Sequence, residues 1–186
     1  MEVVSTSDNQ NKLYLYHRVP ADMQGTTLHP LNILKNTHPD LYLAKAEKYR
    51  DRQHVMQKFI PTLECVWNDV LHLSSVHPAE LKKALIESGM KPRESKFYQI
   101  DPTLLDPKRT TVYLFKYKTE EGDMNPENFS NYDPEKLEVH SIIPQRTREY
   151  YKEMVKKGEH PMTFIGVPHI LHKGSIDISN LPIITV

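Results

Sequence analysis

The chain has 186 residues, of which 38% are hydrophobic and 26% charged, and its 24 basic residues balance 24 acidic ones. This length and composition fit a single globular domain with its own core, and the zero net charge gives no support for a nucleic-acid partner. The single cysteine excludes an intramolecular disulfide and a thiolate metal cluster.

The sequence contains no pattern that predicts a signal peptide or a membrane span. Its first residues, MEVVSTSDNQNK, have no basic start and no apolar run, and no window approaches the roughly 18 apolar residues of a membrane span. We therefore expect a cytoplasmic protein without a membrane partner. The six glycines are isolated from one another, which excludes phosphate-binding loops of the P-loop or GxGxxG kind.

The first part of the chain predicts one strand followed by a helix. Residues 1–11 are polar and are expected to be loose. Residues 13–19 alternate β-forming side chains and predict a strand. Residues 37–58 predict a helix with Pro39 in its first turn, and the many charges of this segment indicate a wide solvated face.

Two more helices are predicted before residue 90. In residues 62–76 the apolar side chains recur at the i, i+3, i+4 and i+7 positions of a buried helical stripe: Leu63, Val66, Trp67 and Val70. Residues 77–89 carry Pro78 at the first helical position and Gly89 as a stop. Helices are therefore expected mainly in residues 37–90.

The second half of the chain is dominated by predicted strands. The predicted elements are, in chain order, strands at 96–101 and 110–117, a polar loop at 118–135, a helix at 144–157 and short strands from 162 to the end. Strands and helices do not alternate regularly. Residues 12–186 therefore predict a single α+β domain with a mixed or antiparallel sheet, of which a split sheet is one form.

The densest polar cluster, WNDVLHLSSVHP, lies in the segment predicted as a helix. On a helix, Asp69 and His72 share a face, because they are three residues apart. Such a pair is suited to acid–base catalysis, or to metal binding together with His77. The same pair also fits a hydrogen bond at a helix edge without any catalytic role.

His17 and Arg18 are adjacent polar residues inside the first predicted strand, in the stretch LYLYHRVP. Neighbours on a strand point to opposite faces, so the pattern leaves open which of the two faces a cleft. A strand holds its side chains rigidly, as ligand recognition requires. The pair is therefore a candidate binding site, and equally a candidate end of a structural hydrogen-bond network.

Both ends of the chain resemble the ADP-ribosyltransferase superfamily, which includes the poly-ADP-ribose polymerases. Tyr16-His17 is similar to the YH at the end of the family's first strand. The segment PHILHKGSIDISNLPIITV has the outline of the family's last strands, and FYQIDPTLL resembles its middle strand and turn. His169 stands where the family's catalytic glutamate would be. Tyr98 and Tyr113 are candidates for its mid-chain aromatic motif.

The resemblance implies NAD as the cofactor, bound in a cleft edged by His17, Arg18 and His169. His17 would hold a ribose, Arg18 would meet the pyrophosphate, and His169 would replace the family's acid as orienting group or base. Asp69 and His72 would approach from a helix packed nearby, and the two tyrosines would add cofactor contacts. The chain would then be an NAD-binding or other nucleotide-binding protein of the ADP-ribosyltransferase type.

Two hypotheses from other classes stay open. One is a non-enzymatic module that contacts a protein partner through residues 37–58 and 118–135, which expects an exposed apolar patch and no deep polar cleft. The other is a metal-assisted hydrolase or nuclease that uses Asp69, His72 and His77. No local metal-ligand motif supports the latter, and the leading hypothesis needs no metal.

Overall fold

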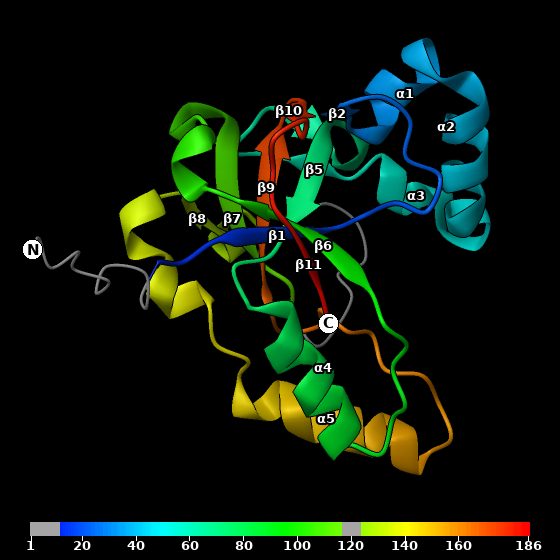
Figure 1. Cartoon of the computed structure of the whole chain (residues 1–186), viewed down its shortest axis with the longest axis vertical. Coiled ribbons are helices and arrows are strands. Elements are labelled where there is room, and N and C mark those ends of the chain that lie inside the picture. Colours follow the sequence, from blue (N-terminus) through cyan, green and yellow to red (C-terminus); the bar gives the residue numbers. More distant parts are fainter. Residues whose placement is uncertain (1–11, 117–123) are drawn as a thin grey trace, which may run out of the picture.

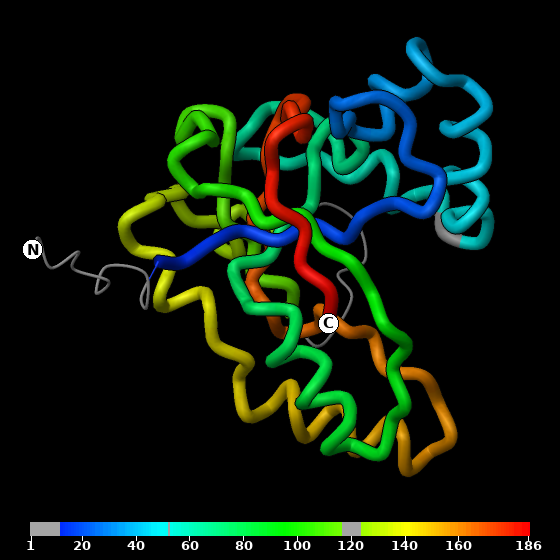
Figure 2. The backbone as a smooth tube through the Cα atoms, in the orientation of Figure 1, coloured from blue at the N-terminus to red at the C-terminus, as the bar shows by residue number. Residues whose placement is uncertain are grey.

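Antiparallel sheets form the centre of the molecule in this computed structural model, which describes residues 12–116 and 124–186 (Figure 1). The predictions for residues 1–11 and for 118–123 lie outside the described residues. One sheet has the strand order β1-β6-β11. It is built from Leu15–Arg18, Lys96–Ile100 and Ile183–Thr185. In Figure 2 the blue, green and red segments that meet at the centre are these three strands.

A second sheet has the strand order β5-β9-β7-β8. Its strands are Val70–Leu73, Pro168–Lys173, Thr110–Leu114 and Phe129–Asn131. Two short pairs join β2 (Thr27–Leu28) to β10 (Ile176–Asp177) and β3 (Phe59–Ile60) to β4 (Cys65–Val66). Every strand pair in the described part of the chain is antiparallel. The α+β class with an antiparallel sheet is thus confirmed.

The two main sheets touch at a single bridge between Tyr16 and Ser74. The Tyr16 amide donates to the Ser74 carbonyl at 2.8 Å, and the Ser74 amide donates to the Tyr16 carbonyl at 3.1 Å. Beyond this bridge β1 pairs only with β6, and β5 pairs only with β9. The sheets therefore separate on the side where His17 and Arg18 lie across from His72.

The helices gather at the two ends of the molecule (Figure 1). At one end lie α1 (Leu31–Thr37), α2 (Pro39–Ala46), the 3-10 helix η1 (Glu47–Arg52) and α3 (Gln53–Met56). At the other end α4 (Pro78–Glu87) packs against α5 (Gln145–Lys156). Five further 3-10 helices are described: η2 (Trp67–Asp69), η3 (Pro102–Leu104), η4 (Pro107–Arg109), η5 (Pro126–Asn128) and η6 (Pro134–His140).

The predicted ends of α4 follow from its sequence. The His77 Nδ1 atom accepts a hydrogen bond from the Ala79 amide at 3.1 Å, and Pro78 occupies the first turn. Gly89 has a φ of 97°, a left-handed conformation that glycine adopts without strain. The predicted helices at 77–89 and 144–157 are confirmed, and the predicted helix at 37–58 is present as the series α2, η1 and α3.

The helix predicted at residues 62–76 is wrong, because this segment forms β4, η2 and β5. Val70, Leu71 and Leu73 are all buried, so β5 has apolar contacts on both of its faces. A strand of this kind has no polar alternation, and its apolar run cannot be told from a buried helix by periodicity. The helices of the first half still lie mainly in residues 37–90, as predicted, but residues 62–76 do not form one of them.

The polar loop predicted at 118–135 is also not loop throughout, because its described part contains η5 and β8. β8 pairs with β7, and the rings of Phe129 and Tyr113 stack with centroids 4.8 Å apart. A three-residue edge strand is too short to give a periodic signal. None of the helices in the described residues has the length and apolarity needed to cross a lipid bilayer.

The main core lies between the sheets, and Ile170 is at its centre. Ile170 has no exposed surface and lies in β9 between β5 and β7. We expect Ile170→Ala to lower the free energy of unfolding by about 2–5 kcal/mol, since it leaves a cavity in a packed core. The matched control is Ile183→Ala in β11, where the side chain is 52% exposed and the loss should stay within about 0.5 kcal/mol. Urea denaturation measures both, and equal losses would contradict this core.

Candidate functional site

Two adjoining cavities open where the sheets separate. The first has a volume of about 560 Å³ and the second of about 400 Å³, and both are lined by His17, Arg18 and His72. His17 and Arg18 are the last two residues of β1, and His72 lies on β5. Both cavities are within the size range of small-molecule sites. His17 and Arg18 of β1 and His72 of β5 therefore form a wall that the two cavities share, called the shared wall below.

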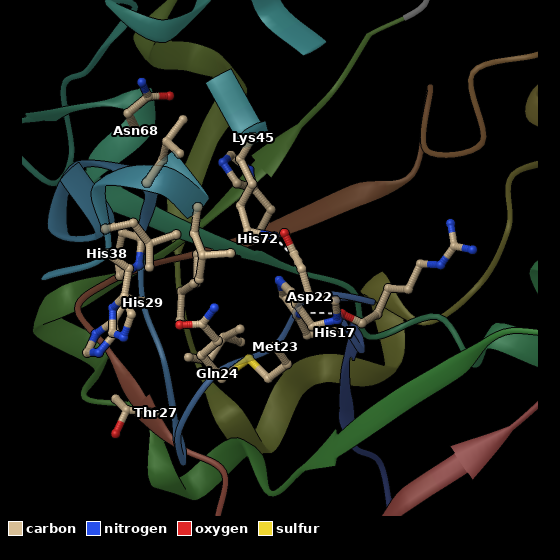
Figure 3. Close-up of a pocket in the computed structure, with 18 of the residues that line it drawn as sticks. His17, Asp22, Met23, Gln24, Thr27, His29, His38, Lys45, Asn68 and His72 are labelled. Carbon is tan, nitrogen blue, oxygen red and sulfur yellow. Dashed lines mark hydrogen bonds and ion pairs between the residues drawn. The ribbon is translucent and has the colours of Figure 1, made fainter. Parts of the chain in front are cut away.

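The first cavity lies between this shared wall and the helices α1 and α2 with η1 (Figure 3). Lys45 and Lys48 contribute positive charge to its lining, and Asp22 forms an ion pair with Lys45 at 2.8 Å. Trp67, the single tryptophan of the chain, lines it next to His72, with ring centroids 4.3 Å apart. The cavity thus combines cations with an aromatic surface.

His38 and His29 close another side of the first cavity (Figure 3). The His29 ring is hydrogen-bonded through Nδ1 to Ser175 Oγ at 2.7 Å. The Nδ1 atom of His38 is buried and has no hydrogen-bond partner among the described residues. A buried polar atom without a partner is costly. A ligand in this cavity would therefore gain from a group that hydrogen-bonds to His38.

The second cavity brings together His17, His72 and His169, which come from three distant parts of the sequence. The rings of His72 and His169 are nearly perpendicular, with centroids 6.5 Å apart. His17 Nδ1 donates to its neighbour's carbonyl, the Arg18 oxygen, at 2.7 Å, and His169 Nδ1 donates to the Val167 carbonyl at 3.0 Å. Both rings are thereby oriented with Nε2 left as the acceptor of the neutral imidazole.

Burial keeps these three rings neutral. Loss of hydration, followed by the positive charges of Lys48 and Lys45, lowers the pKa of His17 to about 4. The pKa of His72 falls to about 3, mainly through loss of hydration and then through its electrostatic interaction with His169. Burial also lowers the pKa of His169 to about 4. At neutral pH all three are hydrogen-bonding groups without charge.

Asp69 does not form the expected pair with His72. Because this segment is a 3-10 turn followed by a strand, residues three apart no longer share a face. The two carboxylate oxygens of Asp69 accept hydrogen bonds from Asn32 Nδ2 at 2.7 Å and from the Val66 amide at 3.0 Å. Asp69 thus fixes the turn before β5 and ties it to α1.

This structural role for Asp69 gives a prediction. We expect Asp69→Ala to lower the free energy of unfolding by about 1–3 kcal/mol, because it removes two hydrogen bonds from a partly buried turn. Asp51→Ala, at an exposed position in η1, serves as the control. Nucleotide affinity should be the same in both variants. A large loss of affinity in Asp69→Ala alone would contradict the purely structural role and show that Asp69 takes part in binding.

The other expected residues are placed as follows. Tyr98 and Tyr113 are 5% and 4% exposed, belong to the core and line neither cavity, so they cannot contact a ligand bound there. His77 caps α4 and meets the Tyr16 ring, with centroids 5.0 Å apart. Asp69, His72 and His77 therefore form no common site. No group of three or more metal-ligating side chains is found among residues 12–116 and 124–186.

Sequence reasoning missed the cations of the site. Lys45 and Lys48 are three apart on the helical segment, which is the spacing of one face, but the sequence does not show that this face meets a cavity. Comparison of the chain with protein-family models, curated proteins and solved structures gives no match.

Proposed function

We propose that the chain is a nucleotide-binding protein of the ADP-ribosyltransferase type, which takes NAD in the first cavity with its reactive end at the wall of His17 and His72. One observation carries the proposal: His17 lines both cavities and meets His169, from the opposite end of the sequence, in the second one, so the two chain ends come together beside the space assigned to NAD. The resemblance at the two chain ends requires that His17 and His169 lie close together.

The charge at the shared wall suits a pyrophosphate. Arg18 is exposed at the end of β1, and its guanidinium has no ion-pair or hydrogen-bond partner among the described residues. A guanidinium can donate two parallel hydrogen bonds to phosphate oxygens. Lys48 adds positive charge to the same cavity, while the charge of Lys45 is paired with Asp22. Arg18 is therefore assigned to the pyrophosphate.

The histidines have complementary roles in this proposal. His17 accepts a hydrogen bond from a ribose hydroxyl through Nε2. His169 faces the second cavity and orients the acceptor. In the transfer step an acceptor oxygen bonds to the anomeric carbon of the ribose, the bond to nicotinamide breaks, and nicotinamide leaves with the bonding electron pair. The acceptor proton passes to His169 Nε2.

Isothermal titration calorimetry of the whole chain with NAD tests the proposal. We expect saturable binding of NAD and of ADP-ribose, which shares the pyrophosphate, and weaker binding of nicotinamide, which lacks it. The Lys152→Ala variant, which removes an exposed charge of α5 outside both cavities, should bind like the unaltered chain. Absence of heat with both NAD and ADP-ribose would refute the proposal.

The interaction-module hypothesis receives some support from exposed apolar side chains. Leu43 on α2 is 65% exposed, and Val139 and Ile142 are 74% and 70% exposed. That hypothesis, however, expects no deep polar cleft, whereas two cavities with cationic and histidine linings are present. Nucleotide binding therefore remains the better supported function.

A further inference from the structure

The second cavity has apolar walls and a cationic lining. It lies between α4, the strands β1 and β6, and the segment that leads into β9. Its apolar side chains include Val76, Leu81, Leu85, Phe97 and Phe164. Its cationic side chains are Arg18, Lys82 and Arg93. This arrangement can desolvate the body of a ligand while it attracts a negative charge.

No Asp or Glu side chain contributes to the described lining of this cavity. The acidic residues of the adjacent helix α4 are occupied elsewhere, because Glu87 and Glu80 face Arg148 at 2.9 and 4.0 Å. Lys82 and Arg93 have no ion-pair partner among residues 12–116 and 124–186. The described lining therefore carries three cationic side chains against one carboxylate, that of Val186, which accepts a hydrogen bond from the Ser95 amide at 2.8 Å and forms no ion pair with the three cations.

We propose that the second cavity binds a second ligand, a small molecule with an aromatic or aliphatic body and one anionic head group. The body lies against Phe97 and Leu81, and the head group meets Lys82 and Arg93. That this ligand is the acceptor of the transfer reaction rests on the function proposed above. The anion-binding cavity itself rests only on its lining.

The position of the cavity explains why it would serve as the acceptor site. It shares His17, Arg18 and His72 with the first cavity, and it alone of the two is lined by His169. A ligand on each side of the shared wall would place two substrates next to one another without competing for the same space. NAD and the second ligand should therefore bind at the same time.

A pair of fluorescent probes tests the charge requirement in the whole chain. Anilinonaphthalene sulfonate is an aromatic anion, and N-phenylnaphthylamine is its neutral counterpart. Energy transfer from Trp67, which lies beside His72, reports binding near the shared wall. We expect one saturable site at which the anion binds about tenfold more tightly than the neutral probe.

Charge-removal variants locate this site. Lys82→Ala with Arg93→Ala should weaken binding of the anionic probe about tenfold and leave the neutral probe unchanged. The control, Lys152→Ala with Lys156→Ala, removes the same charge from the exposed face of α5 and should change neither. Displacement of the dye by naphthoate or by naphthyl phosphate at the lower concentration then identifies the head group as carboxylate or phosphate.

Three results would overturn the inference: equal binding of the two probes, an unchanged affinity in the Lys82 and Arg93 variant, or competitive displacement of the anionic probe by NAD. Failure of the proposed function is a separate result. If NAD does not bind but the anionic probe keeps its dependence on Lys82 and Arg93, the anion-binding cavity stands and only its role as an acceptor site is lost.

Discussion

Arg18→Ala is expected to lower the affinity of the chain for NAD by at least about tenfold, because in the proposed complex the guanidinium supplies charged hydrogen bonds to the pyrophosphate at the shared wall. Arg18→Lys keeps the charge but loses the paired donors, and should give an intermediate affinity. The folded state should be little changed, since Arg18 is exposed and its guanidinium has no ion-pair or hydrogen-bond partner in the described residues. Calorimetric titration of each variant with NAD measures the effect.

The comparison needs both a charge control and a fold control. Lys152→Ala removes a positive charge from α5 without touching either cavity. Urea denaturation of each variant shows whether the fold is intact. An Arg18→Ala protein that is folded and binds NAD like the unaltered chain would remove Arg18 from the site, whatever the behaviour of the histidines.

Acidification from about pH 7 to about pH 4.5 is expected to destabilise the protein steeply, because four histidines, one buried and three half-buried, resist protonation in the folded state. The pKa values of His17, His169 and His172 are lowered to about 4, and that of His72 to about 3. In the unfolded chain these groups have an ordinary pKa near 6.5. The unfolded state therefore takes up protons first, so stability is complete above about pH 6.5 and falls as the pH drops toward the folded values.

The free energy of unfolding should be measured by urea denaturation across this range. Each of these four histidines contributes a slope of up to about 1.4 kcal/mol per pH unit. Asp101 does not contribute to the change in stability over this pH range. Hydrogen bonds from Lys12 and Thr103 lower its pKa to about 2, so it changes the stability only below its ordinary pKa of 3.8. His72→Phe should remove one histidine's contribution to this slope, because one proton fewer is taken up on unfolding. The exposed His54→Gln should leave the slope unchanged. A stability that is constant, or that rises on acidification, would contradict the burial of these rings.

The sequence predicted those elements whose ends carry proline or glycine. α4 and α5 were predicted almost to their ends, because proline and glycine mark helix boundaries through backbone geometry alone. β5 was missed because both of its faces are buried, so a local pattern could not separate strand from helix. The acid–base pair of Asp69 and His72 depended on that helix and was lost with it.

The candidate site was predictable only in part. The resemblance at the two chain ends brought His17 and His169 forward, and the structure has both lining one cavity. Lys82 and Arg93 could not be assigned, because only the packing of α4 beside β1 and β6 brings them to the same space. Arg18 and His17 both reach the cavities although neighbours on a strand point apart, because the sheets separate at the end of β1.

A crystal structure of the whole chain with NAD tests the central claim most directly. We expect NAD in the first cavity, with its pyrophosphate within hydrogen-bond distance of the Arg18 guanidinium, a ribose hydroxyl at His17 Nε2 and the second cavity left open. NAD bound away from His17 and Arg18, or crystals that take up no NAD at saturating concentration, would contradict the account.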